Sequence, residues 1–340
     1  MTSAPVAAAL EPGSAPLRLA TLADRYRALR LIRGFEEQAL DLVKSGVIVG
    51  GIHPYIGQEA VAVGVCAALR PDDQITSTHR GHGHVLAKGA DPRRMLAELA
   101  GRETGLNRGR GGSMHAADLS LGILGANGIV GAGAPIAAGA AWAAKQAGVD
   151  RVAVTFFGDG ALNQGVLLET LNLAAIWRLP VLFVCENNGY ATTLPAATAV
   201  AGSALGRAAA FDIPAVAVDG MDTEAVLAAA RSAVTRARAG GGPTFLECHT
   251  YRFEGHHTAE RRFRLSYRTP EEVAAWRTRD PLARGAALLD EPEREAIDVE
   301  VAALLGEARE FALAGDAPDP ADASKYLYAD GLRPRAGVSV

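Results

Sequence analysis

The residues of this sequence that are best suited to chemistry follow two apolar runs. Asp159 stands between two glycines directly after residues 152–157. Asn187 and Asn188 come just after residues 181–185. Carboxylate and carboxamide oxygens are hard ligands, which suit magnesium or calcium better than zinc. Glycines beside a carboxylate allow a tight turn and a close approach of the backbone to a phosphate at the next helix N-terminus. The pattern therefore indicates a site for a metal ion and a phosphate.

The two apolar runs are the strands that must position these side chains. Both are rich in β-branched and aromatic residues, as buried parallel strands are. A helical pattern of leucine and alanine joins them, and Pro180 ends that helix. In a right-handed β-α-β unit both strands point the same way. Because α/β sheets bind ligands outside the carboxyl ends of their strands, Asp159 and the two asparagines are predicted to share one sheet edge.

Simple turns are the alternative interpretation of both glycine-containing stretches, since Gly, Asp and Asn commonly serve turns. The spacing favours a site instead. Between Gly160 and Asn187 lie 26 residues, which matches the signature GDG…NN of thiamine diphosphate enzymes. Taken with both strand contexts, the signature indicates a cofactor site.

The composition excludes several other classes of protein. The chain has 340 residues, of which 49% are apolar and 21% charged, and its formal net charge is −4. These values are typical of a globular protein, and the acidic balance argues against a nucleic-acid partner. The three cysteines have no C-x-x-C spacing, which is typical of reduced thiols in the cytoplasm rather than of a disulfide framework.

No segment is predicted to act as a targeting signal or a membrane span. Residues 1–16 lack the patterns of signal and transit peptides, and we expect a disordered N-terminal extension there. Residues 121–144 carry no charge and are long enough to cross a bilayer, yet they hold six glycines and Pro135. We therefore expect a buried loop that leads into a tightly packed helix beginning at Pro135. Residues 17–330 are predicted to form one α/β domain with C-terminal helices, and residues 331–340 a tail.

Periodicity predicts the other elements of this domain. The fold class is α/β, a parallel sheet flanked by helices. The further predicted elements are an amphipathic helix over 22–44, an alanine-rich helix after the loop 52–58, strands at 215–218 and 244–251, a helix from Thr223 to about Ala239, a loop over 191–210, and helices between 270 and 313.

Three histidines, His79, His82 and His84, accompany Arg80 within residues 77–84. We expect a strand that presents the three on one face, either as a metal site or as donors for an anion. No acidic or thiol ligand lies close by in sequence. The anion is therefore favoured, because arginine and imidazolium both complement phosphate. A polar loop without function is the alternative.

Other polar stretches have more than one interpretation. The glycine-rich residues 108–115 carry two arginines and fit an RNA-binding loop or a flexible linker, but the acidic chain argues against RNA. Residues 252–268 are highly charged, and they fit either a mobile active-site loop or a solvated surface loop. His53 is, by composition alone, a hydrogen-bonded loop histidine.

With these segments in place, the sequence resembles the α subunit of the thiamine diphosphate-dependent dehydrogenase component of 2-oxo acid dehydrogenase complexes. This family includes pyruvate, branched-chain 2-oxo acid and acetoin dehydrogenases. The likeness covers residues 22–329 and implies the diphosphate-binding α/β fold. Besides the GDG…NN unit, the stretches that carry it are residues 32–36, His53, and residues 57–60, 78–83, 111–115 and 127–131.

The resemblance implies roles for particular residues. Asp159, Asn188 and the carbonyl of Tyr190 are expected to bind Mg²⁺. His53 and His256 are the expected catalytic residues, and residues 249–268 correspond to the family's flexible loop. The residues expected to contact thiamine diphosphate are His79, Arg80, Gly128, Val130, Gly158, Asp159, Gly160, Ala161, Asn188 and His256.

The resemblance also implies a reaction and partners. The substrate would be a 2-oxo acid or acetoin, which is decarboxylated or cleaved, and the acyl group would pass to a lipoyl-bearing acyltransferase. The cofactor takes up the electrons of the broken bond. In this family the glutamate that activates the cofactor sits on a separate β subunit, so a heterotetramer is implied and the chain alone is expected to be inactive.

Departures from the family pattern bear on the substrate. His79 stands where many members have tyrosine, and this form resembles acetoin-type α subunits. The basic residues 261–265 lengthen a segment that is usually short and acidic. They favour an alternative function, a thiamine diphosphate-dependent transferase that forms a C–C bond with a non-lipoyl acceptor. A third hypothesis is a scaffold subunit without catalysis, against which the intact ligand set argues.

Overall fold

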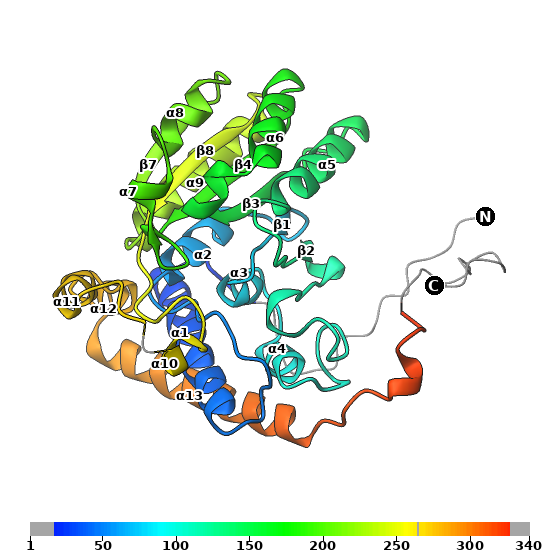
Figure 1. Cartoon of the computed structure of the whole chain (residues 1–340), viewed down its shortest axis with the longest axis vertical. Helices are drawn as coiled ribbons and strands as arrows, with labels where there is room; N and C mark the ends of the chain where they lie inside the picture. The colour runs from blue at the N-terminus through cyan, green and yellow to red at the C-terminus, as the bar shows by residue number, and fades with distance from the viewer. Residues whose placement is uncertain (1–16, 264, 327–340) are drawn as a thin grey trace.

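A sheet of parallel strands lies at the centre of the computed structural model, which describes residues 17–263 and 265–326 (Figure 1). The strand order is β2-β1-β3-β4-β8-β7. The bounds of these strands are β1 Gln74–Thr76, β2 Ile123–Gly125, β3 Ala153–Gly158, β4 Val181–Asn187, β7 Ala215–Asp219 and β8 Thr244–His249. All the pairings between them are parallel, so the carboxyl ends of all these strands lie at one edge.

Helices cover both faces of the sheet, as the predicted fold class requires (Figure 1). One apolar core lies between the sheet and α5 (Gly133–Gln146), α6 (Gly165–Ile176) and α8 (Ala204–Ala209). The other contains residues of α1 (Leu22–Lys44), α2 (Glu59–Cys66), α3 (His82–Ala87), α4 (Pro92–Leu99), α9 (Thr223–Arg238) and α13 (Glu291–Ala314).

Alternate side chains along each strand pack into these two cores. In β3, Val154 and Phe156 enter the core with α1 and α2, whereas Ala153 and Phe157 enter the core with α5 and α6. Successive side chains of a strand point to opposite faces. A strand covered on both faces therefore reads as the continuous apolar run seen in the sequence.

Capping explains why the long first helix begins where it does. Thr21 accepts a hydrogen bond from the backbone of Asp24, whose carboxylate in turn accepts from the backbone of Thr21. This capping box satisfies two of the free N–H groups at a helix start. Farther from the sheet, α1 packs against α13 and α12 (Pro281–Ala286), and α4 packs against α13.

The structure confirms the predicted strands of the central unit and those near 215 and 244. It also confirms the helices over 22–44 and after Thr223, and the C-terminal helices, which are α11 (Pro270–Arg277), α12 and α13. The strands β1 and β2 were not predicted, because three residues are too few to show a period. The helix predicted to start at Pro135 starts at Gly133. Proline is tolerated there, since first-turn N–H groups have no intrahelical acceptor.

The prediction of a loop over 191–210 is wrong in part. This stretch holds the small hairpin strands β5 (Tyr190–Ala191) and β6 (Leu194–Pro195), the single turn α7 (Ala196–Ala199), and α8. Ser203 caps α8 by accepting from the backbone of Gly206. Alanine has the highest helix propensity, so the alanines here favoured helix more than the loop interpretation allowed.

Two further expectations concern segments at the margins. The N-terminal extension over 1–16 and the tail over 331–340 lie outside the described residues. Among the residues that the structure describes, no helix combines the length and apolarity needed to cross a bilayer. The uncharged stretch 121–144 instead ends in α5, which buries Ala134, Ala137 and Ala141 against the sheet. The loop before α5 was expected to be buried, but it exposes Ile129 and Val130.

Candidate functional site

A cavity of about 350 Å³ lies at the carboxyl edge of the sheet. Its wall comes from the segments that follow β1, β2, β3, β4 and β8. The register explains the convergence, because Gly158 at the end of β3 pairs with Glu186 of β4, and Asn187 pairs with His249 of β8. Stretches far apart in the chain therefore meet at one edge, where α/β sheets place their ligands.

Every site residue predicted from the sequence lines this cavity. They are His53, His79, Arg80, Gly128, Val130, Gly158, Asp159, Gly160, Ala161, Asn188, Tyr190 and His256. The structure thus brings the whole predicted set together. The role of each residue toward a ligand stays a prediction.

Asp159 follows β3 directly and begins the short helix η3 (Asp159–Asn163). Its side chain is buried, and neither carboxylate oxygen has a hydrogen-bond partner among the described residues. Burial raises the pKa of the Asp159 carboxyl above its ordinary value, because the charged form loses its hydration, and the backbone amides of Asp159 and Asn188 and the charge of Arg252 offset this only in part. A buried carboxylate without a well-formed hydrogen bond is costly, and a cation in the cavity would compensate it.

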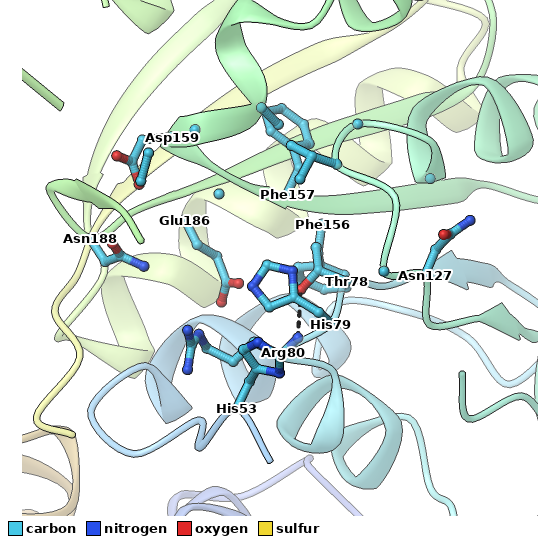
Figure 2. A pocket seen from close by; sticks show the side chains of 18 of the residues that line it. His53, Thr78, His79, Arg80, Asn127, Phe156, Phe157, Asp159, Glu186 and Asn188 are labelled. Carbon is cyan, nitrogen blue, oxygen red and sulfur yellow. Dashed lines mark hydrogen bonds between the residues drawn. The ribbon is translucent and has the colours of Figure 1, made fainter. Parts of the chain in front are cut away.

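Asn188 lies beyond the end of the neighbouring strand, on the same side of the cavity as Asp159 (Figure 2). Its Nδ2 donates to Oε1 of Gln58 at 3.1 Å, and its Oδ1 accepts from the backbone N–H of Tyr190 at 3.2 Å. The amide is thereby oriented with Oδ1 turned toward the backbone of Tyr190. The side-chain oxygen of Asn188 and the backbone carbonyl of Tyr190 are the two oxygen atoms predicted to bind the metal ion together with Asp159.

The start of η3 supplies backbone N–H groups to the cavity. Gly160 and Ala161 stand in its first turn, where amides have no intrahelical acceptor. A side chain at Gly160 would meet Cβ of Ala191 at 3.0 Å, tighter than most such contacts. Glycine therefore lets the hairpin after β4 approach this turn closely. It also adds no side chain between its own amide and the cavity that Gly160 and Ala161 line.

Arg80 is buried at the opposite side of the cavity from Asp159 (Figure 2). Its Nη1 donates to the carbonyl of Pro54 at 2.6 Å, and its Nη2 donates to the carbonyl of His256 at 3.0 Å. Burial and the charge of Arg252 lower the pKa of Arg80 below its ordinary value. Two buried guanidinium groups facing one cavity favour an anionic ligand there.

Four imidazoles gather beside Arg80. The ring of His53 lies 4.6 Å from that of His79, 4.8 Å from that of His256 and 4.6 Å from that of His257, measured between centroids. Burial and the charge of Arg80 lower the pKa of His79 to about 4 and that of His256 to about 2. Burial followed by the neighbouring His79 also lowers the pKa of His53 well below its ordinary value. All three rings are therefore neutral at pH 7.

His53 is not the hydrogen-bonded loop histidine that composition suggested. Its Nδ1 is buried and has no partner among the described residues. His256, by contrast, is held in place, because its Nδ1 lies 3.2 Å from Nη2 of Arg80 and its backbone N–H donates to Glu260. The charged stretch 252–268 therefore contributes Arg252 and His256 to the cavity wall, whereas its mobility stays a prediction.

The prediction that His79, His82 and His84 share one face of a strand is wrong, and the spacing of three between His79 and His82 already places them on opposite faces of a strand. The strand β1 ends at Thr76, and His82 and His84 belong to α3. Both are fully buried outside the cavity lining. His82 bridges Glu36 and Ser113 at 2.9 and 2.8 Å. The helix turns these two side chains away from His79, so only His79 reaches the cavity.

Sequence reasoning missed two buried charged residues of the cavity wall. Glu186 points between Asn188 and the histidines (Figure 2), and it accepts a short hydrogen bond from the hydroxyl of Tyr55. Arg252 is almost completely buried, with Nε and Nη1 lacking partners among the described residues. Arg252 directly follows the predicted strand 244–251, and this position at the binding edge of the sheet could have indicated a site residue.

Comparison with known proteins agrees with this geometry. Residues 27–321 match the model of the family described as "Dehydrogenase E1 component". The chain belongs to this family. It is 50% identical over 248 residues to the α subunit of an acetoin:2,6-dichlorophenolindophenol oxidoreductase of Bacillus subtilis, covering 73% of this chain and 74% of the relative.

Two other relatives extend the match over most of the chain. The Cupriavidus necator protein of the same name is 47% identical over 330 residues, or 94% of this chain and 98% of the relative. The α subunit of a Rhizobium meliloti pyruvate dehydrogenase E1 component is 42% identical over 315 residues, or 90% and 88%. Dehydrogenase E1 components are thiamine diphosphate-dependent oxidoreductases, so the family and the predicted cofactor agree.

Proposed function

We propose that this chain is the α subunit of a dehydrogenase E1 component that binds thiamine diphosphate and Mg²⁺ and acts on acetoin or a 2-oxo acid. The observation that carries the proposal is Asp159. Both of its carboxylate oxygens are buried in the cavity without a hydrogen-bond partner among the described residues, in a chain of the E1 family. A buried carboxylate in this position favours the binding of a cation that compensates its charge.

The residues present fit a magnesium diphosphate. Asp159 would bind the metal ion with Asn188 Oδ1 and the carbonyl of Tyr190, which together form the all-oxygen set that Mg²⁺ prefers. Mg²⁺ commonly takes its remaining ligands from substrate phosphates and water. A diphosphate would therefore bind in the same site as the metal ion and supply some of its oxygen ligands.

The diphosphate would lie between two sources of positive charge. The free amides of Gly160 and Ala161 face it from the start of η3, and Arg80 faces it from the loop after β1. Arg252 adds a guanidinium, two of whose nitrogens have no hydrogen-bond partner in the described part of the chain. Amides at a helix start and arginines are the donors that proteins use for phosphate.

The bound cofactor would supply the electron sink for breaking a bond beside a ketone carbonyl. The chain's own residues would then orient the substrate and handle protons. The neutral rings of His53, His79 and His256 can each donate or accept one hydrogen bond. Val130, which is 44% exposed at the cavity mouth, would hold the cofactor by packing, and Gly128 would let it approach the backbone.

The relatives support the remaining parts of the proposal. Those from Bacillus subtilis and Cupriavidus necator are named for acetoin, and their names identify them as α subunits. We propose a β subunit that completes the active site in a heterotetramer, and a lipoyl-bearing acyltransferase that receives the acyl group. The buried free thiols of Cys66, Cys185 and Cys248 fit a cytoplasmic location. We assign residues 17–330 to the cofactor-binding domain.

Calorimetry on the assembled α and β subunits tests this function. Thiamine diphosphate should bind in the presence of Mg²⁺, and Asp159→Ala should abolish that binding, whereas the surface change Asp72→Ala should not alter it. Turnover of acetoin, pyruvate and branched-chain 2-oxo acids then assigns the substrate. Absence of cofactor binding, or binding unchanged by Asp159→Ala, would overturn the proposal.

A further inference from the structure

The buried carboxylate of Glu98 lies outside the cavity, near the end of α4. Its side chain is fully buried, and among the described residues the nearby Arg108 and Arg110 form ion pairs with Glu103 rather than with Glu98. A negative charge in the last turn of a helix also opposes the helix dipole. Burying an ionised carboxylate without a counter-ion costs several kcal/mol unless hydrogen bonds replace its water, so some other group must stabilise this one.

Four backbone N–H groups of one loop provide that stabilisation. Oε2 of Glu98 accepts from Asn107 at 2.7 Å and from Gly109 at 2.8 Å. Oε1 accepts from Gly111 at 2.7 Å and from Gly112 at 3.0 Å. We call residues 105–112 the glycine-rich loop. Its amides form the kind of concave nest that binds anions in other proteins, but here the anion is a side chain of the same protein.

The glycines of this loop are explained by the carboxylate that they surround. A Cβ at Gly105 would lie 2.4 Å from Oε2 of Glu98 and 2.6 Å from its Cα, which is a steric overlap. Gly109 and Gly112 adopt positive φ angles of 70° and 60°, a region that other residues avoid. Glycine at the start of the loop leaves room for the Glu98 side chain, and glycines near its end allow the backbone conformation that directs the amides toward the carboxylate.

The glycine-rich loop leads directly into the wall of the candidate active site. Ser113 follows it and lies 2.8 Å from Nε2 of the buried His82. Met114 lines the cavity. A Cβ at Gly128 would lie 3.8 Å from Sδ of Met114 and 3.8 Å from the ring of His115. The residues that follow the loop therefore lie beside Gly128, and Met114, Gly128 and Val130 line the same cavity.

The outer side of the loop is held differently. Glu103 forms ion pairs with Arg108 at 3.2 Å and with Arg110 at 3.0 Å, and all three side chains are at least one-quarter exposed. Exposed pairs contribute little to stability. Two carboxylates therefore bind this loop. Glu98 binds its backbone on the buried side, and Glu103 binds its arginine side chains on the solvent-exposed side.

We propose that Glu98 is a positioning residue for the active site: its buried carboxylate fixes the glycine-rich loop, and through Met114 that loop fixes the cavity wall at Gly128 and Val130. Glutamine in its place would present an NH₂ group to two of the four backbone donors. The loop would then lose its fixed conformation while the sheet and the other side of the cavity kept theirs.

Hydrogen exchange on the full chain assembled with its β subunit tests the structural part. In Glu98→Gln, the amides of residues 107–112 should exchange at least about tenfold faster, as expected when hydrogen bonds to a charged acceptor are lost, while those of β3 and β4 stay unchanged. Glu103→Gln is the matched control and should leave the loop protected. Unchanged protection of the loop, or faster exchange spread evenly over the domain, would overturn the proposal.

Cofactor affinity tests the link to the site, and this arm rests on the proposed function. The Kd for thiamine diphosphate with Mg²⁺ should rise about tenfold in Glu98→Gln, and saturating cofactor should restore kcat, because the reacting groups are unchanged. A Kd equal to that of the unmodified enzyme would overturn the link. If the unmodified enzyme binds no thiamine diphosphate, the proposed function fails, and hydrogen exchange alone decides the role of Glu98.

A second variant keeps the test decisive if Glu98→Gln does not assemble. Gly105→Ala retains the carboxylate and places a methyl group against it. The same local loss of protection and the same rise in Kd are expected. A fully protected loop in Gly105→Ala would contradict the close fit between the loop and Glu98.

Discussion

Arg80 Nη2 lies 3.0 Å from the backbone carbonyl oxygen of His256 and 3.2 Å from Nδ1 of the same residue. This contact joins the loop after β1 to the loop after β8 across the mouth of the cavity. The ring of His256 is neutral at pH 7, and among the described residues the guanidinium of Arg80 donates to these groups and to the carbonyl of Pro54 rather than to a carboxylate. The buried cation is thus left to attract an anion, while its own position is fixed by hydrogen bonds.

Replacing Arg80 by lysine should weaken cofactor binding. Lysine keeps the charge, but it loses the planar fork of donors that reaches two carbonyls and a phosphate together. We expect a loss of about 1.5–3 kcal/mol, or roughly 10- to 100-fold in Kd for thiamine diphosphate by calorimetry. Arg27→Lys, at the partly exposed pair with Glu300, is the control. An unchanged Kd in Arg80→Lys would show that this guanidinium does not bind the cofactor.

Asp159→Asn should affect stability and metal binding in opposite directions. Without cofactor, the variant should be more stable by about 1–3 kcal/mol, because a buried, unpaired carboxylate is replaced by a neutral amide. With Mg²⁺ and thiamine diphosphate, the stabilisation seen in the unmodified enzyme should be lost. Thermal unfolding with and without ligand measures both effects. A cofactor-free variant less stable than the unmodified protein would indicate that Asp159 has a stabilising partner.

The sequence was sufficient to predict the central β-α-β unit and the residues at its edge. Long apolar runs predict buried strands, and the chirality of the connection places Asp159 and Asn188 together. The other residues of the cavity wall could not be predicted from composition and periodicity alone. These left His53 as a loop histidine and Arg80 as part of either an anion site or a polar loop, and the family motif then placed both residues in the site.

The features that could not be predicted depend on contacts between distant segments. The strand β1 has three residues, so the strand expected over the histidines after it was wrong, and they lie in a loop and in the helix α3. Glu186 at the end of β4 and Arg252 after β8 were missed because the charge of a residue gives no local sign of its burial. The fit of four amides around Glu98 is invisible in sequence, since it depends on the conformation of a glycine-rich loop.

The neutral histidines predict a loss of stability at acid pH. Burial and the charge of Arg80 lower the pKa of His79 from its ordinary value of 6.5 to about 4. Between these values the unfolded chain binds a proton that the folded chain does not, so the free energy of unfolding falls as pH falls. For His79 alone the loss between pH 7 and pH 5 is about 2 kcal/mol. Urea unfolding of the cofactor-free protein at both values should show this slope.

The contribution of His79 is isolated by substitution. His79→Gln removes the titrating ring, and the difference in stability between pH 7 and pH 5 should shrink by about 2 kcal/mol. His115→Gln, at an exposed histidine, is the matched control and should keep the full slope. A slope in His79→Gln identical to that of the unmodified protein would show that His79 is protonated as readily in the folded state as in the unfolded chain.

Tyr55 offers a test of the buried network behind the cavity. Its hydroxyl donates to Oε1 of Glu186 and lies 3.1 Å from Nε2 of His84, whose Nδ1 is 2.7 Å from the hydroxyl of Ser77. All four residues are buried, and both Glu186 and Ser77 line the cavity. Burial and the charge of Glu186 raise the pKa of Tyr55 well above its ordinary value, so the hydroxyl stays protonated and acts as a donor.

Tyr55→Phe keeps the ring that packs against Gly83 and removes only the hydroxyl. Glu186 then loses a donor in a site that water reaches poorly, and the free energy of unfolding should fall by about 1–3 kcal/mol in urea titrations. Tyr326→Phe, at a tyrosine 47% exposed, should change it by less than about 0.5 kcal/mol. If Tyr55→Phe is as stable as the unmodified protein, Glu186 must be protonated or hydrated without Tyr55, and the hydroxyl is not what holds this carboxylate at the cavity.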